Sequence, residues 1–287
     1  MASGNGMSAC CLSGKLHEGK PVGREEQLGG LSVYVSEPKG GSKAKSLIFI
    51  TDGTHAVAVF GWETPNVRLL ADEYAKAGFY VYVPDFLEGD SLDMSFLDNI
   101  APSLKTQEGQ GVTDKAANTA IVGTTLATWL PKHTEGKTKP MVDGFVNTLR
   151  TTPGTDKLGA VGFCWGARYA ILEAHGQSTD ENGSGIGGVD AVVGYHPSLV
   201  TVPGDFDPVK VPLSLAVGTK DSVLDNDTVG KIQDLLTKKA DVPNEVRVYE
   251  DQVHGFALRG DWSSDKDKKA MDDSIQQGVE WLQKYLS

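Results

Sequence analysis

The sequence has few cysteines. It contains three in 287 residues, and two of them, Cys10 and Cys11, are adjacent. A disulfide framework needs cysteines that can pair, so we expect a reducing compartment and a free thiol at Cys164. A zinc site of Cys10, Cys11 and His17 would lack both the usual spacing of about two residues between cysteines and a second ligand pair. We therefore expect no metal site, and interpret this segment as part of an amino-terminal strap.

Long apolar runs and clusters of basic residues are also missing. No stretch approaches the roughly 18 apolar residues of a membrane helix, and residues 1–14 lack the basic region and apolar run of a signal peptide. The 27 basic and 38 acidic residues give a net charge of -11, with no block of Lys or Arg suited to a phosphate backbone. We expect a soluble, cytoplasmic protein that binds neither membrane nor nucleic acid. Its oligomeric state stays open.

The chain does contain an alternation of strand and helix patterns over residues 31–287. Continuous apolar runs at residues 46–51 and 78–84 are typical of strands buried in a parallel sheet, and residues 66–77 between them have helical spacing. The pattern predicts one α/β domain with a mostly parallel central sheet flanked by helices on both faces, preceded by a partly extended strap over residues 1–30. Further strands are expected at 190–195, 211–217 and 245–250, and further helices at 226–239 and 268–286.

The middle of the chain is less regular. Residues 85–111 have no clean period and are expected to form a loop near a substrate pocket, followed by a helix over 113–130. Residues 131–140 resemble a charged, proline-bounded connector that leads into a helix over 141–150. Residues 176–188 are rich in Gly and polar residues, which indicates a surface loop.

One segment carries a chemical signature. Residues 159–168 read G-A-V-G-F-C-W-G-A-R, an apolar strand that runs through a G-x-C-x-G turn into helix-forming residues. Such a strand-turn-helix elbow exposes a nucleophile, and glycines suit its flanks because backbone approaches them closely. A helix N-terminus favours a thiolate through its free N–H groups and dipole. Cys164 is therefore the candidate nucleophile.

A thiol nucleophile needs a histidine base, and at elbows of this kind the acid and then the histidine follow the nucleophile in the chain. His175 lies about three turns into the following helix, so it should point elsewhere. His196, in Y-H-P-S, could line the pocket mouth but leaves too little chain for an acid-bearing strand before it. His254, in Q-V-H-G-F after the last expected strand, is the best candidate base.

The candidate acid is Asp221, which ends G-T-K-D after an apolar strand. Asp225 and Asp227 are close rivals, but they fall where the next helix is expected to begin and suit capping. The order of the three motifs around Cys164, Asp221 and His254 is more specific than any one of them alone.

These motifs, G-F-C-W-G, G-T-K-D and H-G-F, resemble those of the dienelactone hydrolase family from about Ser32 to the carboxyl end. The segment F-G-W-E-T-P-N at 60–66 and C-C-x-S-G near the start are similar to its fungal-type branch. The resemblance implies an α/β-hydrolase fold and a Cys-His-Asp triad that cleaves an ester or opens a lactone through an acyl-enzyme, without a cofactor. It also implies an oxyanion hole from the backbone N–H of Trp165 and from the loop after Thr51, where Gly53 is the candidate.

The chain departs from this family at one point. Members generally carry an acid immediately before a hydrophobic-Phe-Gly sequence, where it helps to ionise the cysteine. Here Ala58 and Val59 precede Phe60-Gly61. The nearest acids are Asp52 upstream and Glu63 downstream. Asp52 reaches Cys164 from a lengthened loop, or the thiol-activating role has moved to Glu63 or been lost; these alternatives stay open.

Substrate recognition is less specified. Arg259 is in the right neighbourhood to bind a carboxylate, whereas Arg168 suits a structural ion pair. Aromatic residues beside strand ends could form pocket walls or belong to the core; they are Trp62, Phe86, Trp165, Tyr195 and Phe256. The expected activity is hydrolysis of a small ester or lactone. The alternatives are a thioesterase with the same triad and a non-catalytic member of the fold that binds a small molecule.

Overall fold

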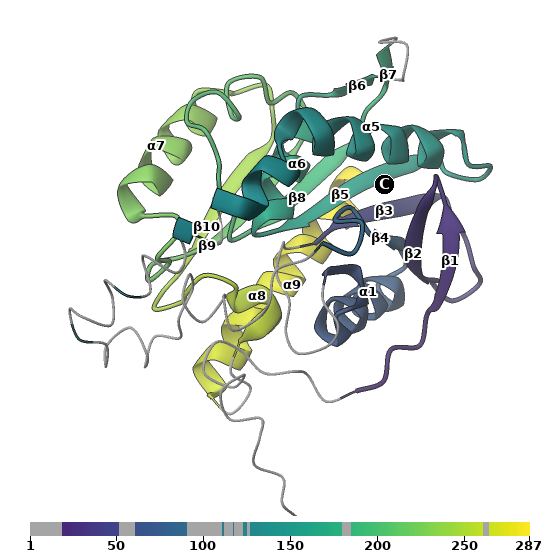
Figure 1. The fold of residues 1–287 in the computed structure, drawn as a ribbon, viewed down its shortest axis with the longest axis horizontal. Coiled ribbons are helices and arrows are strands. Elements are labelled where there is room, and N and C mark those ends of the chain that lie inside the picture. The colour runs from purple at the N-terminus through teal and green to yellow at the C-terminus, as the bar shows by residue number, and fades with distance from the viewer. Residues whose placement is uncertain are drawn as a thin grey trace, which may run out of the picture.

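A computed structural model describes residues 19–51, 61–90, 111, 117, 123–124, 127–179, 185–260 and 264–287. Its centre is an eight-stranded sheet with the order β1-β2-β4-β3-β5-β8-β9-β10 (Figure 1). The strands in that order are β1 (Arg24–Leu28), β2 (Leu31–Ser36), β4 (Tyr80–Pro84), β3 (Lys45–Ile50), β5 (Lys157–Phe163), β8 (Ala191–Tyr195), β9 (Leu213–Gly218) and β10 (Asn244–Tyr249).

Most of the sheet is parallel. β2 pairs antiparallel with both β1 and β4, and every pairing from β4 through β3 to β10 is parallel. Parallel neighbours end at the same edge of a sheet, so the loops that follow β5, β8, β9 and β10 meet there. These are the loops that carry Cys164, His196, Asp221 and His254.

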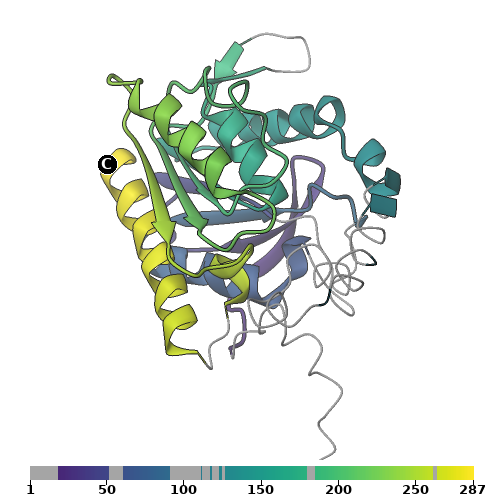
Figure 2. The same cartoon turned by 90° about the vertical axis from the view of Figure 1, so that its left-hand side faces the viewer.

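Helices cover both faces of the sheet (Figures 1 and 2). One layer contains α1 (Pro65–Lys76) and α9 (Asp265–Tyr285), and the other contains α5 (Glu135–Thr151), α6 (Trp165–Glu173) and α7 (Asn226–Thr237). In β3, Leu47 and Phe49 pack in the first core while Ile48 and Ile50 pack in the second. Both faces of a central strand are therefore buried, which explains its continuous apolar sequence.

Two expected boundaries differ from the structure. The strap expected over residues 1–30 contributes β1, whose polar sequence R-E-E-Q-L is tolerated because it lies at the sheet edge. The connector expected at 131–140 was wrong, because α5 begins at Glu135 and contains Pro140. Pro140 lies inside α5 and removes one of its backbone hydrogen bonds, but the buried face of Val142, Phe145 and Val146 stabilises the helix.

Several short elements were not expected. They are η2 (Gly61–Glu63), η3 (Leu130–Lys132), α8 (Phe256–Arg259), and the two-stranded pair β6 (Gln177–Thr179) and β7 (Gly185–Gly187) within the predicted loop 176–188. Most of the helix expected over 113–130 lies outside the described residues.

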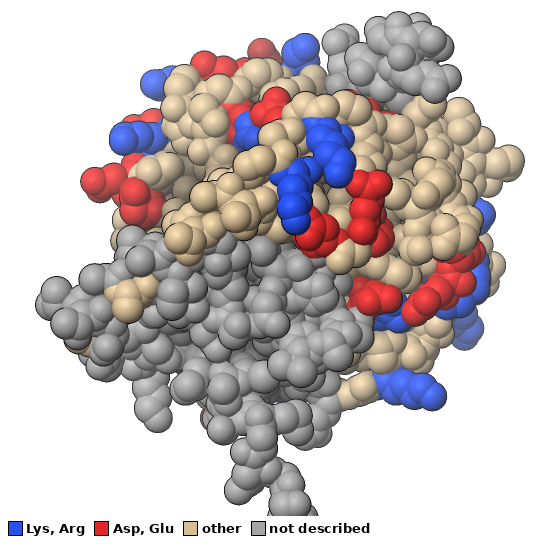
Figure 3. All heavy atoms as spheres, in the orientation of Figure 1, with Lys and Arg blue, Asp and Glu red and all other residues tan. Residues whose placement is uncertain are grey.

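The surface is mixed in charge. On the face shown in Figure 3, acidic and basic side chains lie close to one another between larger uncharged areas. Within the described part of the chain, no helix is long and apolar enough to cross a membrane.

Candidate active site

Cys164 lies at the junction between β5 and α6, where the chain turns sharply. Its φ is 51° and its ψ is -114°, a conformation that an L-residue rarely adopts, and its side chain is 8% exposed. The turn leaves no room for larger residues. A Cβ at position 162 would lie 2.5 Å from the Cα of Ala167, and one at position 166 would overlap the carbonyl oxygen of Ile50. The two glycines of the motif are thus required by close backbone approach.

His254 and Asp221 form a buried pair at the same sheet edge. The Nδ1 atom of His254 lies 2.9 Å and 3.1 Å from the two carboxylate oxygens of Asp221. The Oδ1 atom of Asp221 also accepts hydrogen bonds from the backbone N–H groups of Val223, at 2.7 Å, and Leu224, at 3.0 Å. These contacts fix the carboxylate, which in turn orients the imidazole ring.

The protonated form of His254 is stabilised. Burial alone would lower the pKa of His254, but the charges of Asp221 and Cys164 and hydrogen bonding outweigh it and raise that pKa to about 10. Asp221 holds the Nδ1 side of the ring, and Cys164 acts on the ring through its charge and a hydrogen bond. Both partners therefore favour the protonated imidazole.

Ser198 contacts the sulfur of Cys164 directly. The Ser198 Oγ atom lies 3.5 Å from the Cys164 Sγ atom, and the backbone N–H of Ser198 donates to the carbonyl of Cys164 at 3.1 Å. The backbone N–H of Cys164 donates in turn to the carbonyl of Tyr195, also at 3.1 Å. Sequence analysis missed Ser198. Its signal was the segment Y-H-P-S at the end of the strand that pairs with β5.

His196 lies behind His254 rather than at the pocket mouth. It is fully buried, and its ring centroid lies 5.1 Å from that of His254. Burial lowers its pKa well below the usual value, and the positive charges of His254 and Arg259 lower it further. His196 is therefore a neutral imidazole beside a cationic one.

The two candidate arginines occupy different surroundings. Arg259 is buried at the end of α8, and its guanidinium lies so close to Gly255, at φ 87°, that a Cβ there would overlap it. The predicted ion pair of Arg168 is confirmed. Its guanidinium donates to Asp205 at 2.8 Å and 3.1 Å and to Glu135 at 2.6 Å.

All five aromatic residues considered for pocket walls belong to the hydrophobic cores, and three of them pack away from the elbow. Tyr195 is fully buried, and its hydroxyl bonds to that of Tyr74 at 2.5 Å. Phe86 packs edge-on against Phe145 in the other layer. Trp62 is buried beneath the guanidinium of Arg68. These strand-end aromatics fill the two layers between helices and sheet.

The other two aromatic residues are nearer the site. Trp165 begins α6 directly after Cys164 and is 4% exposed. Phe256 is buried and its ring centroid lies 6.1 Å from that of His196. Trp165 is placed beside Cys164 by the elbow, and Phe256 is placed near His254 by the loop after β10.

The family was determined by comparison with known proteins. The model of the dienelactone hydrolase family matches residues 31–286. The chain belongs to the dienelactone hydrolase family. Among curated relatives, it is similar to hydrolase pyvD of Aspergillus violaceofuscus, with 27% identity over 97% of each chain. It is also similar to the carboxymethylenebutenolidase homolog of Mus musculus, with 25% identity over 96% of each chain.

Solved structures share the fold. A putative dienelactone hydrolase from Klebsiella pneumoniae superposes with a TM-score of 0.64 and 19% identity, covering 92% of this chain and 99% of that one. The dienelactone hydrolase-like phosphotriesterase P91 from metagenomic libraries gives a TM-score of 0.62 at 14% identity, covering 92% and 98%. The predicted α/β-hydrolase fold is confirmed, and the protein is a hydrolase of the ester and lactone type.

Some positions expected to matter in a dienelactone hydrolase lie outside the described residues. They include Asp52 as the thiol-activating acid and Gly53 as an oxyanion donor, so both stay predictions; the amino-terminal segment with Cys10, Cys11 and His17 is likewise outside. Glu63 is half-buried in η2. Among the residues that can be described, no group of three or more His, Cys, Asp or Glu is arranged to hold a metal ion.

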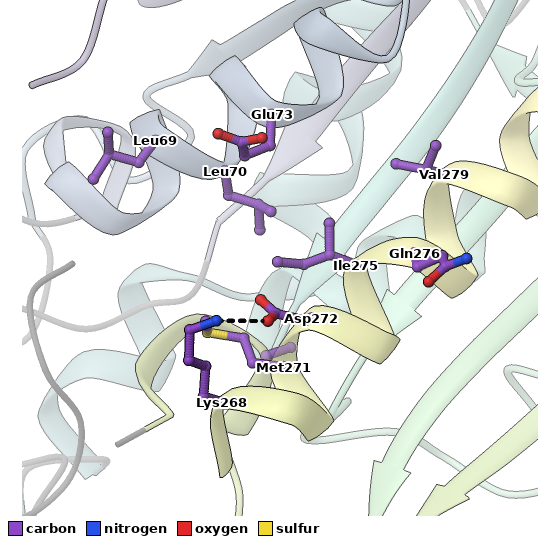
Figure 4. Close-up of a pocket in the computed structure, with 10 residues that line it drawn as sticks. Leu69, Leu70, Glu73, Lys268, Met271, Asp272, Ile275, Gln276 and Val279 are labelled. Atoms are coloured by element: carbon purple, nitrogen blue, oxygen red, sulfur yellow. Dashed lines mark hydrogen bonds and ion pairs between the residues drawn. The ribbon is translucent and has the colours of Figure 1, made fainter. Parts of the chain in front are cut away.

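A groove of about 450 Å³ separates α1 from α9 in this member of the family (Figure 4). Leu70 of α1 lies opposite Ile275 of α9, and the charged side chains of Glu73, Lys268 and Asp272 lie at its margin. None of its lining residues is among those gathered around Cys164. The groove is thus distinct from the candidate site.

Proposed function

We propose that this dienelactone hydrolase family member cleaves a small ester or lactone with Cys164 as nucleophile, His254 as base and Asp221 as the acid that orients it. One observation carries the proposal. The buried imidazole of His254 lies 2.9 Å from the carboxylate of Asp221, and Cys164 helps to raise the pKa of that imidazole. This is the electrostatic arrangement that a thiolate–imidazolium pair requires.

The first half of the reaction forms an acyl-enzyme. The Cys164 thiolate attacks the carbonyl carbon, and the electron pair of the carbonyl moves onto its oxygen, where the N–H groups of Trp165 and Gly53 stabilise it. Collapse of the intermediate breaks the bond to the leaving alkoxide, which takes a proton from the His254 imidazolium. The products are an acyl thioester on Cys164, an alcohol and a neutral His254.

The second half returns the enzyme to its starting state. Neutral His254 takes a proton from water, and the resulting hydroxide attacks the thioester carbonyl. The second tetrahedral intermediate expels the Cys164 thiolate, so the thiolate–imidazolium pair is restored and a carboxylic acid is released. Asp221 stabilises the imidazolium in both halves and keeps the ring in one orientation.

The thiolate also needs partners before substrate arrives. We assign one of these roles to Ser198, whose hydroxyl can donate to the sulfur across the 3.5 Å contact. Asp52 or Glu63 is proposed as a further ionising group. Arg259, beside the histidines, is proposed to attract an anionic substrate group by its charge, although its burial restricts direct contact.

The decisive experiment compares the wild type with Cys164→Ala on p-nitrophenyl acetate. Turnover should disappear in Cys164→Ala and persist in the matched control Cys10→Ala/Cys11→Ala. Unchanged turnover by Cys164→Ala would refute the assignment of the nucleophile. Including a thioester in the panel tests the thioesterase alternative, and no turnover of any ester, lactone or thioester by the wild type would favour a binding function.

A further inference from the structure

A second cavity lies beside α6, the helix that follows Cys164. Its volume is about 330 Å³, and its walls include Leu130, His133, Trp165, Tyr169 and Leu199. Trp165 follows Cys164 in the chain, and Leu199 follows Ser198, the residue that contacts the sulfur. Adjacent Cα atoms are about 3.8 Å apart, so Trp165 and Leu199 bring the cavity near the proposed nucleophile, although Cys164 does not line it.

Three flat rings, those of His133, Trp165 and Tyr169, line this cavity. The ring of Trp165 packs against that of Tyr169 with centroids 4.6 Å apart. Behind it, Trp129 stacks on His133 at 4.2 Å and meets Trp165 edge-on at 5.8 Å. Rings that pack against one another are held rigidly, and a cavity with such walls favours a planar apolar group over a flexible or strongly hydrated one.

The positive charge of Arg168 at the rim of the cavity is already paired with carboxylates. Arg168 lines the cavity, but its guanidinium is engaged by both carboxylate oxygens of Asp205 and by Glu135. An anionic ligand would have to compete with these two carboxylates, so the cavity favours an uncharged group. The exposed part of the lining also includes one apolar side chain. Leu199 is 46% exposed and has a backbone φ of 57°, whereas Thr134 and Glu135 are the exposed polar residues of the lining.

We propose that this cavity binds an uncharged, planar ring of the ester or lactone substrate. The ring rests against Trp165 and Tyr169 while the reacting carbonyl lies at Cys164, and Leu199 covers its edge. The inference rests on the proposed function of Cys164 and adds the substrate class, an ester or lactone that bears an uncharged planar ring.

The test narrows the cavity and compares two lactones of the same ring size. Dihydrocoumarin carries a fused benzene ring and δ-valerolactone carries none. In Leu199→Trp, the loss in kcat/KM for dihydrocoumarin should exceed the loss for δ-valerolactone by about tenfold, the equivalent of one substantial apolar contact. If Leu199→Trp does not fold, Leu199→Ala should raise KM for dihydrocoumarin more than KM for δ-valerolactone.

The control places the same large residue elsewhere. Val22→Trp, at a residue that is 77% exposed, should leave both lactones at wild-type rates. Equal losses for the two lactones in Leu199→Trp would overturn the proposal.

A binding measurement separates this proposal from the catalytic one. In Cys164→Ala, neutral benzamide should quench tryptophan fluorescence because Trp165 lines the cavity, and adding Leu199→Trp should weaken its binding by about tenfold. Benzoate binding should change less. Unchanged ester turnover by Cys164→Ala with benzamide binding retained would refute the nucleophile alone, whereas benzamide binding that is unaffected by Leu199→Trp would refute the ring site alone.

Discussion

The hydroxyl oxygen of Ser198 lies 3.5 Å from the sulfur of Cys164, and backbone hydrogen bonds join the same two residues. The loop after β8 thus holds the elbow through both a side-chain and a backbone contact. The backbone of this loop adopts positive φ at His196, 38°, and at Leu199, 57°. Such conformations persist only where surrounding contacts fix them, so the position of Ser198 is set by the fold.

Removal of the Ser198 hydroxyl should destabilise the thiolate form of Cys164. In Ser198→Ala, the rate of alkylation of Cys164 by iodoacetamide at pH 7 should fall, because a hydrogen bond to the charged sulfur is lost. Ser198→Thr keeps a hydroxyl and should restore part of the rate. Equal alkylation rates for the wild type and Ser198→Ala would show that Ser198 does not stabilise the thiolate.

Asp221 and Asp225 offer a matched pair of acids. Asp221→Asn should reduce kcat by about 10²- to 10⁴-fold, because the orienting charge behind the imidazole is lost. Asp225 instead caps α7 by accepting from the backbone N–H of Thr228 at 2.7 Å. Asp225→Asn should therefore keep wild-type kcat on p-nitrophenyl acetate. The p-nitrophenyl acetate assay measures kcat for both variants. A larger loss of kcat in Asp225→Asn than in Asp221→Asn would assign the role of the acid to Asp225.

The pKa of His254 can be measured by NMR titration of its imidazole. Burial lowers that pKa, but Asp221 contributes most to raising it and Cys164 contributes next, for a net value of about 10. Asp221→Asn should therefore lower it further than Cys164→Ala does. An imidazole that titrates at the same pH in all three proteins would contradict this electrostatic coupling.

The same shift makes stability depend on pH in a defined direction. The folded state holds the His254 proton more tightly than the unfolded chain, whose pKa is 6.5. Its contribution is complete below about pH 6.5 and is lost as pH rises towards about 10. Urea unfolding at pH 6.5 and 9 should show a smaller decrease in the free energy of unfolding for Asp221→Asn than for the wild type.

Gly166 in the elbow and Gly144 in α5 differ in the space that a side chain would have. A Cβ at Gly166 would overlap the backbone oxygens of Ile50 and Thr51, so Gly166→Ala should reduce the free energy of unfolding by more than about 2 kcal/mol. Gly144 in α5 has nothing within 4 Å of such a Cβ. Gly144→Ala should increase stability by about 0.4–1 kcal/mol through the unfolded state. Thermal melts of both variants test the contrast.

The fold was predictable where hydrophobic pattern and length agree. The runs at 46–51 and 78–84 became β3 and β4, and the helical spacing of 66–77 became α1 within one residue at each end. β1 was missed because an edge strand with the sequence R-E-E-Q-L carries no apolar alternation. α5 was misjudged at its start because Pro140 was taken as a boundary.

The candidate site was predictable where its residues directly follow strands. Cys164, Asp221 and His254 each follow a strand, so the order of motifs places them at one sheet edge. Ser198 could not be found that way, because its contact depends on a loop with two left-handed residues that no periodicity encodes. The sequence also did not predict that Tyr195 lies in the core, because its hydroxyl bonds to that of Tyr74, which is far away in the sequence.

The central claim is that Cys164 carries the acyl group. Rapid quenching of the wild type with p-nitrophenyl acetate, followed by peptide mass spectrometry, tests it most directly. The account predicts an acetyl group on the peptide that contains Cys164, a longer-lived adduct when His254→Ala is acylated slowly, and none on that peptide in Cys164→Ala. Turnover with no acetyl group on Cys164, or an adduct confined to Cys10 and Cys11, would contradict it.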